Sequence, residues 1–199
     1  MSLVVVPTGT ANTASVLAAL RRLGVSPSMA ASAAEVARAE RVVLPGVGSF
    51  GAAMAEVERQ GMRRILVDRV LEGRSTLAVC VGMQLLARAS EESADVDGLG
   101  LVGQDVRRFP ETVRVPQLGW NRVSVTSGEC RFVDDGWAYF ANSFRITEAP
   151  DGWSAAVADH GGTFVAAMER GDVLACQFHP ELSGSYGSSV LARWLGSEH

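Results

Sequence analysis

Cys80 stands where a strand pattern changes to a helix pattern. The apolar run LAVC (77–80) predicts a strand ending at Cys80, and VGMQLLARA follows at once with helical periodicity. A strand, a tight turn and a helix in this order form a nucleophile elbow, in which the reactive side chain is pushed out towards the first helical turn. The positive helix N-terminus favours a thiolate, and Gly82 lets the backbone come close. Taken alone, a cysteine in such a place is more often a small buried apolar residue.

A candidate base lies about a hundred residues further along the chain, where the strand predicted for VLACQF (173–178) runs into His179-Pro180-Glu181. An imidazole can take the proton of a nearby thiol, while a carboxylate two residues on holds the ring. The other histidines are His160 and the terminal His199. The tripeptide alone could also be a solvated surface loop. Cys130, in a predicted turn, and Cys176, inside a strand, have no comparable setting.

The elements that must position these groups alternate along the first half of the chain. Apolar runs predict strands at 3–6, 42–45 and 77–80, and amphipathic patterns predict helices at 16–24, 52–73 and 82–89. Strands that are apolar throughout and separated by helices predict a parallel sheet covered on both faces. Functional residues of such a sheet are expected at the carboxyl ends of its strands. Cys80 and His179 should therefore meet at one edge.

The second half of the chain has a different pattern of predicted elements. From about Leu99, short strand patterns are punctuated by Gly, Pro and Asp, at 122–126, 137–146, 153–159 and 163–170, followed by a buried strand at 173–178 and a closing helix at 187–196. These patterns predict antiparallel strands and hairpins added to the sheet. We expect a single α/β domain over residues 1–199, with a mostly parallel central sheet flanked by helices.

Composition excludes several classes of function. The 199 residues are 47% apolar with a net charge of −4 and no basic run, which argues against a nucleic-acid partner. No apolar run approaches the roughly 20 residues of a membrane span, and the first is stopped by Pro7. Three widely spaced cysteines argue against a disulfide framework and for a cytoplasmic location. No cysteine pair or histidine pair has the spacing of metal ligands, so the sequence does not predict a metal site.

Five stretches carry a resemblance to a known family: VVLPGVGSFGAAM (42–54), CVGMQLLARASEES (80–93), RVPQLGWNRV (114–123), YFANSF (139–144) and CQFHPELSGSYG (176–187). A cysteine elbow followed far downstream by His-Pro-Glu resembles the class I glutamine amidotransferases. In order and spacing, the five stretches are similar to the glutaminase subunits of imidazole glycerol phosphate synthases. The resemblance covers essentially the whole chain and implies a flavodoxin-like fold.

The resemblance implies a role for each member of a Cys-His-Glu triad. Cys80 would attack the side-chain amide of glutamine, His179 would relay protons, and Glu181 would hold the imidazole. A glutamyl thioester would form and be hydrolysed, releasing ammonia and glutamate without a cofactor or metal.

PGVG (45–48) matches the family's oxyanion segment. The donors would be the N–H of the Gly46–Val47 peptide and the N–H of Val81. A lone PGVG would otherwise be an ordinary turn. We hypothesise that this peptide turns its N–H inward only when the partner is loaded.

The resemblance also implies a glutamine pocket, lined by Gly48, Gln84, Glu92, Asn142, Ser143 and Phe144. Glu92 would suit the ammonium group of the substrate. Without the resemblance, Gln84 and Glu92 would be interpreted as solvated surface residues. The chain departs from the family at five positions. The departures at Gln117, Asn142 and Phe144 leave the pocket contacts open, and that at Leu182 leaves an interface ion pair open. Ala78 affects only the packing of strand against helix.

The family works as a heterodimer with a (β/α)₈ cyclase subunit that receives the ammonia in histidine biosynthesis. The resemblance implies that Asn12 and Trp120 lie near this partner, although Trp120 could also be a core residue. Two alternatives remain open at this point: an amidotransferase subunit of another pathway, and a catalytically silent binding subunit.

Overall fold

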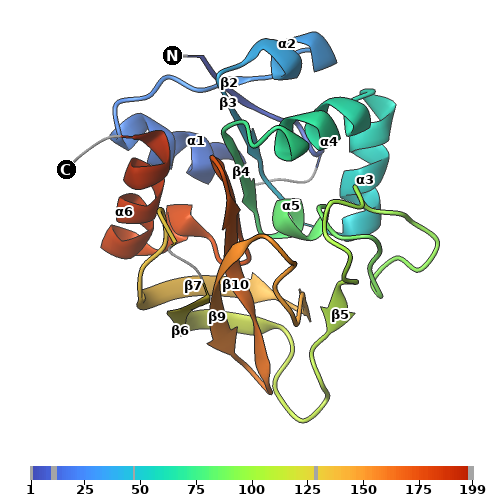
Figure 1. The fold of residues 1–199 in the computed structure, drawn as a ribbon, viewed down its shortest axis with the longest axis vertical. Coiled ribbons are helices and arrows are strands. Elements are labelled where there is room, and N and C mark those ends of the chain that lie inside the picture. The colour runs from blue at the N-terminus through green and yellow to red at the C-terminus, as the bar shows by residue number, and fades with distance from the viewer. Residues whose placement is uncertain (1, 10–12, 47, 128–129, 197–199) are drawn as a thin grey trace.

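The computed structural model describes residues 2–9, 13–46, 48–127 and 130–196. Strands and helices alternate in the first half, and strands dominate the second (Figure 1). In chain order the elements are β1 (Leu3–Val5), α1 (Thr13–Arg22), β2 (Ser28–Met29), α2 (Ala33–Arg38), β3 (Arg41–Leu44), α3 (Phe50–Arg59), α4 (Arg63–Leu71), β4 (Thr76–Val79), α5 (Val81–Gln84), β5 (Arg107–Arg108), β6 (Gln117–Ser127), β7 (Gly136–Asn142), β8 (Phe144–Arg145), β9 (Ser154–Asp159), β10 (Thr163–Arg170), β11 (Val173–Cys176), the 3₁₀ helix η1 (Pro180–Leu182) and α6 (Gly184–Leu195).

Nine of the described strands form one sheet in the order β2-β1-β3-β4-β11-β10-β9-β6-β7. The strands from β2 to β11 pair in parallel, and those from β11 to β7 pair antiparallel. Strands β5 and β8 form a separate ribbon. This mixed sheet confirms the predicted α/β fold with an antiparallel extension.

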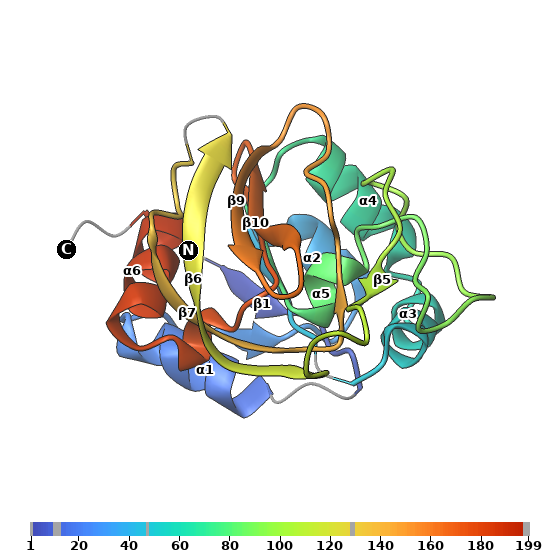
Figure 2. The same cartoon turned by 90° about the horizontal axis from the view of Figure 1, so that it is seen from below.

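The parallel strands lie between helices. Every residue of β1, β4 and β11 is buried, as expected for strands covered on both faces. Helices α1 and α6 lie on one side of these strands, and α3 and α4 on the other (Figures 1 and 2). In the described part of the chain, no helix is long and apolar enough to cross a membrane.

Two predicted helices differ from the structure. The single helix predicted over 52–73 is divided into α3 and α4, because Gly61 adopts a positive φ of 63° and Met62 turns into the core. The helix predicted over 82–89 ends at Gln84. The carbonyls of Leu85 and Arg88 accept hydrogen bonds from Leu99 and Gly98, so the chain pairs with a distant segment instead of continuing the helix.

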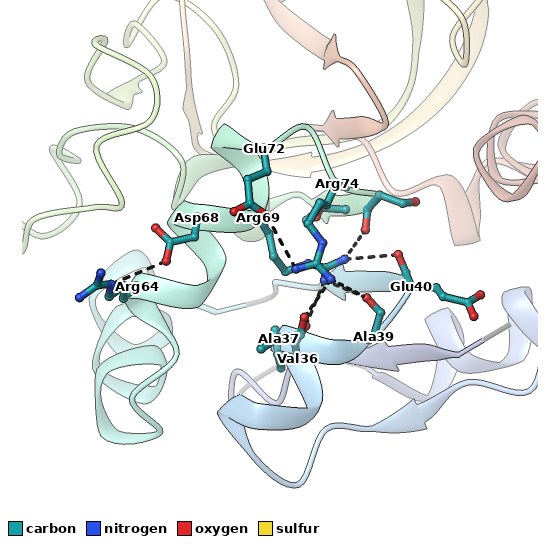
Figure 3. Close-up of polar contacts among 11 residues, drawn as sticks. Val36, Ala37, Ala39, Glu40, Arg64, Asp68, Arg69, Glu72 and Arg74 are labelled. Atoms are coloured by element: carbon teal, nitrogen blue, oxygen red, sulfur yellow. Dashed lines mark hydrogen bonds and ion pairs between the residues drawn. The ribbon is translucent and has the colours of Figure 1, made fainter.

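A buried arginine joins α4 to α2. Arg69 is 1% exposed, and its guanidinium donates at 2.9–3.4 Å to four backbone carbonyls, those of Val36, Ala39, Glu40 and Ser75 (Figure 3). Burial lowers the pKa of Arg69 to about 10, with the charge of Arg74 adding to this effect and that of Glu72 opposing it. Arg69 is therefore still charged at neutral pH, and it binds carbonyls that end α2 and lead into β3 and β4.

Candidate active site

The backbone at Cys80 has the geometry of a strained elbow. Its φ is 53° and its ψ is −111°, and no other non-glycine residue among those described has a positive φ. Such a conformation costs on the order of 1–3 kcal/mol and persists only where its surroundings hold it. The N–H of Cys80 donates to the carbonyl of Cys176 at 2.7 Å, which fixes the elbow to the end of β11.

Two glycines make this elbow possible. A Cβ on Gly82 would lie 2.0 Å from the carbonyl oxygen of Leu44, and a Cβ on Gly46 would lie 2.3 Å from the nitrogen of Gly82. Neither position has room for a side chain, because the segment after β3 packs directly against the first turn of α5. Ala78, where the family usually has glycine, is fully buried in β4.

His179 and Glu181 reach Cys80 from the end of β11, the strand that pairs in parallel with β4. His179 Nδ1 lies 2.8 Å from Glu181 Oε1, and the Cys80 side chain lies close enough to the ring to stabilise its protonated form. The side chains of His179 and Glu181 are only 6% and 7% exposed. The structure therefore brings the three predicted side chains together in a nearly dry setting.

The environment of His179 favours its protonated form. Burial opposes protonation of the ring, but the hydrogen bonds and charges of Cys80 and Glu181 outweigh it and raise the pKa of His179 from 6.5 to about 10. A protonated imidazole in this position can act as a general acid.

The other two thiols lie in settings that suppress ionisation. Burial raises the pKa of the Cys130 thiol to about 11, with the charges of Glu169 and Asp134 adding to it. Cys176 is fully buried, and burial raises its pKa well above the ordinary value. All three cysteines are free thiols.

Gln177 is a neighbour of the triad that the sequence analysis missed. It is fully buried, its Nε2 lies 3.6 Å from Cys80 Sγ, and its Oε1 accepts a hydrogen bond from Gln84 at 3.0 Å. The available signal was a polar residue within the apolar run VLACQF, at the end of the strand that carries the base.

A pocket of about 120 Å³ opens beside Cys80. All of the residues predicted to bind glutamine line it, together with Cys80, Val81 and Ala141: Gly48, Gln84, Glu92, Asn142, Ser143 and Phe144. Gln84 is 3% exposed and donates to the carbonyl of Phe144. The interpretation of Gln84 as a solvated residue was therefore wrong, because α5 is buried throughout.

Glu92 lies between the pocket and the start of α3. Its Oε2 accepts a hydrogen bond of 2.6 Å from the N–H of Phe50, the first residue of that helix. A carboxylate at a helix N-terminus is stabilised by the helix dipole. Glu92 is half-buried and not freely solvated.

The predicted oxyanion donors are not both open. The N–H of Val81 donates to the carbonyl of Gly46 at 3.4 Å, so a backbone oxygen of the PGVG segment faces this N–H. Val47 lies outside the described residues.

An apolar face extends from the outer strands of the sheet. Leu118, Trp120, Trp137 and Leu182 are 65%, 55%, 60% and 45% exposed, and we call these four residues the apolar face. Trp120 pairs across β6 and β7 with Tyr139, at 6.2 Å between ring centroids. Trp120 is thus not a core residue, whereas Asn12 lies outside the described residues.

Comparison with known proteins identifies the class. A solved structure of a glutamine amidotransferase superposes with a TM-score of 0.78 over 98% of both chains at 20% identity, and that of PurLQS from Thermotoga maritima with 0.76 over 98% of this chain and 97% of that one at 18% identity. The model of the family "Glutamine amidotransferase class-I" matches residues 4–195. The chain belongs to the class I glutamine amidotransferases.

Comparison with curated relatives shows to which group within this class the chain belongs. The chain is 37% identical to the imidazole glycerol phosphate synthase subunit HisH of Streptococcus gordonii over 187 residues, which are 92% of this chain and 90% of that protein. It is 37% identical to HisH of Salmonella typhimurium over 98% of this chain and 99% of that one. Within the class, this chain is therefore a HisH-type glutaminase subunit of an imidazole glycerol phosphate synthase and not an amidotransferase of another pathway.

Proposed function

We propose that this glutaminase subunit hydrolyses glutamine with Cys80 as nucleophile, His179 as proton carrier and Glu181 as the residue that holds the imidazole. The observation that carries the proposal is the meeting of Cys80 and His179 at the carboxyl ends of two neighbouring parallel strands, with His179 Nδ1 2.8 Å from Glu181 Oε1. The strained elbow at Cys80 supports it, because such strain accumulates at functional sites.

The proposed reaction has two halves. The Cys80 thiolate attacks the side-chain amide carbon of glutamine, and His179 gives its proton to the leaving nitrogen, so that ammonia departs and a thioester remains. His179 then takes a proton from water, whose oxygen attacks the thioester carbon. The carbon–sulfur bond breaks, and the starting pair of Cys80 thiolate and protonated His179 is restored. The sum is glutamine and water to glutamate and ammonia.

In this proposal, the pocket beside Cys80 binds glutamine. Glu92 carries the negative charge suited to the substrate's ammonium group, and Ser143 lines the same pocket. The contacts that hold Gln84 and Asn142 to the Phe144 carbonyl support a preformed pocket wall.

We also propose that the Gly46–Val47 peptide gates the reaction. The contact between the Val81 N–H and the Gly46 carbonyl supports this, because a donor occupied by a backbone oxygen cannot stabilise an oxyanion. Removing one donor typically lowers the rate about 10²–10³-fold. We expect the isolated chain to hydrolyse glutamine slower by about this factor than the complex loaded with the cyclase's nucleotide substrate. Equal turnover would contradict the gate.

The proposed partner is a (β/α)₈ cyclase subunit that binds the apolar face as the other half of a heterodimer. Exposed aromatic side chains are typical of interface centres. The 37% identical plant protein, imidazole glycerol phosphate synthase hisHF of Arabidopsis thaliana, matches over 33% of its own length, which supports a larger partner unit.

We further propose that residues 1–199 are one amidotransferase domain, because both halves contribute strands to one sheet. We also propose a cytoplasmic location, which three free thiols support.

The test of the catalytic proposal is Cys80→Ala in the complex with the cyclase. We expect glutamine-dependent synthesis to fall by on the order of 10⁴-fold or more, while synthesis from added ammonium stays intact. Cys130→Ala, which removes a thiol distant from His179, is the matched control and should keep both activities. Retained glutamine-dependent synthesis in Cys80→Ala, or loss of both activities, would argue against the triad.

A further inference from the structure

A run of hydrogen bonds joins the wall of the proposed glutamine pocket to the nucleophile. Gln84 Nε2 donates to the main-chain carbonyl of Phe144 at 3.1 Å and to Gln177 Oε1 at 3.0 Å. Gln177 Nε2 in turn donates to Cys80 Sγ at 3.6 Å. Gln84 is 3% exposed and Gln177 is fully buried, so both carboxamides are almost completely shielded from solvent.

The direction of this run is set by the backbone at one end. A carboxamide nitrogen carries two N–H donors, and its oxygen only accepts. The Phe144 carbonyl also only accepts, so the nitrogen of Gln84 must face it, because the reversed amide would bring two oxygens together. The second hydrogen of this nitrogen is taken by the oxygen of Gln177, which leaves the nitrogen of Gln177 turned to Cys80.

This arrangement leaves one atom of Gln84 for the pocket. Gln84 lines the pocket beside Cys80, and its Oε1 accepts no hydrogen bond from any residue that the structure describes. A carboxamide oxygen binds N–H donors and repels other acceptors. Glutamine offers such donors in its ammonium group and in its side-chain amide, so the free oxygen of Gln84 suits this substrate.

We propose that Gln177 is a positioning residue for the glutamine pocket, which locks the Gln84 carboxamide with its oxygen towards the substrate. This inference rests on the proposed glutaminase function and adds a residue that acts from behind the pocket wall. Without Gln177, the Gln84 carboxamide keeps only the Phe144 contact and can turn its oxygen away from the substrate. The strand end that carries His179 therefore also sets which hydrogen bonds the pocket offers.

The test is Gln177→Met, which keeps an unbranched side chain of similar length and removes both polar groups. Glutamate formation is measured against glutamine concentration, in the complex with the cyclase and its nucleotide substrate. We expect the KM for glutamine to rise about fivefold, the factor that corresponds to one hydrogen bond of about 1 kcal/mol. A merely structural role would lower the fraction of active enzyme, and with it kcat, and would leave KM unchanged.

Two further variants sharpen the test. Gln177→Glu keeps an oxygen that accepts from Gln84 in either protonation state, so we expect its KM to return to within about twofold of the wild type. Gln60→Met is the matched control: it removes a carboxamide that donates to a main-chain carbonyl, that of Pro7 at 2.8 Å, but at the end of α3. Its KM should stay at the wild-type value. The unfolding temperatures of all three variants show whether each one is folded in the assay.

The outcomes are distinct. A wild-type KM in Gln177→Met, an equal rise in Gln60→Met, or a rise that a folded Gln177→Glu leaves fully in place would overturn the positioning role alone. Should Gln177→Glu not fold, the KM of Gln177→Met decides. Absence of glutamate from the wild-type complex would overturn the proposed function and this inference with it.

Discussion

At the scale of single residues, the protonation of His179 depends on the two side chains beside it, Cys80 and Glu181. His179 lies between a thiol and a carboxylate, and the contacts of both with its ring outweigh the cost of burying it. The pKa of about 10 means that the folded chain keeps a proton that the unfolded chain releases near pH 6.5. This part of the folding free energy is complete below pH 6.5 and is lost as the pH rises towards about 10.

Replacing Glu181 with glutamine should therefore weaken the fold in a pH-dependent way. A hydrogen bond to a charged group contributes about 1.5–3 kcal/mol, so we expect a decrease of that order in the free energy of unfolding at pH 6. The decrease should shrink towards pH 10, where His179 loses its proton in the wild type. Urea unfolding at both pH values measures it. Glu58→Gln, at an exposed ion pair with Arg63, should change little at either pH, and an equal effect of Glu181→Gln at both would contradict the assignment.

The sequence predicted some of these residues better than others. Cys80 and His179 could be predicted because apolar runs in the sequence show where buried strands end, and parallel strands bring their carboxyl ends to one edge of the sheet. Gln177 could not, because its importance comes from two contacts across the fold, with Cys80 and Gln84. A lone polar residue in a strand gives no indication of which side chains will surround it.

At the scale of elements, long-range contacts decided where local patterns ended. The helix pattern after Cys80 continues to position 89, yet α5 is only one turn long, because residues 98–102 take over the carbonyls that would have continued it. The short strand β2 and the short helix α2 escaped prediction for a related reason. The exposed strand β2 is held by its pairing with β1, and α2 by its packing against α4, and neither has a strong pattern of its own.

Arg69 illustrates this dependence and can be tested. Arg69→Met would remove a donor from four backbone carbonyls, of which those of Ala39 and Ser75 keep a second donor, from Arg74 and Val42. We expect the free energy of unfolding to fall by about 2–4 kcal/mol, since a buried acceptor left unpaired costs about 1–3 kcal/mol. Arg64→Met is the matched control on the same helix; its ion pair with Asp68 is long and exposed, so the change should stay below about 1 kcal/mol (Figure 3). Similar losses in both variants, measured by urea unfolding, would show that the carbonyl contacts of Arg69 are not the cause.

At the scale of the whole molecule, the parallel and antiparallel halves of the sheet contribute different parts of the proposed site and interface. The parallel half carries Cys80 and His179 at its edge, and the antiparallel half presents the apolar face and supplies Asn142 to the pocket. The order of a parallel half followed by an antiparallel half was predictable from the sequence, because the pattern of the predicted strands changes near Leu99. The exposure of Trp120 was not, because an aromatic residue in a strand is equally compatible with core and surface until the neighbouring layers are known.

The apolar face should determine affinity for the cyclase. Trp120→Ala should weaken the complex by about 2 kcal/mol or more, roughly 30-fold in Kd, because truncating an aromatic anchor of an interface has this effect. Leu118→Ala should weaken it less, and Leu71→Ala is the control for Leu118, since Leu71 is similarly exposed but ends α4, away from β6 and β7 (Figure 1). Titration of the labelled chain with cyclase measures all three. Unchanged affinity in Trp120→Ala would move the interface elsewhere.

The contact between Val81 and Gly46 joins two main-chain atoms, an N–H and a carbonyl oxygen. Replacing a side chain leaves both atoms in place unless the new residue is proline, which at position 81 would remove the N–H. Gly46 has no space for a larger residue because the nitrogen of Gly82 is in the way. The gate that we propose against idle loss of glutamine would therefore lie in the path of the backbone and not in any one side chain. Few single mutations can unlock it without also damaging the turn that carries the nucleophile.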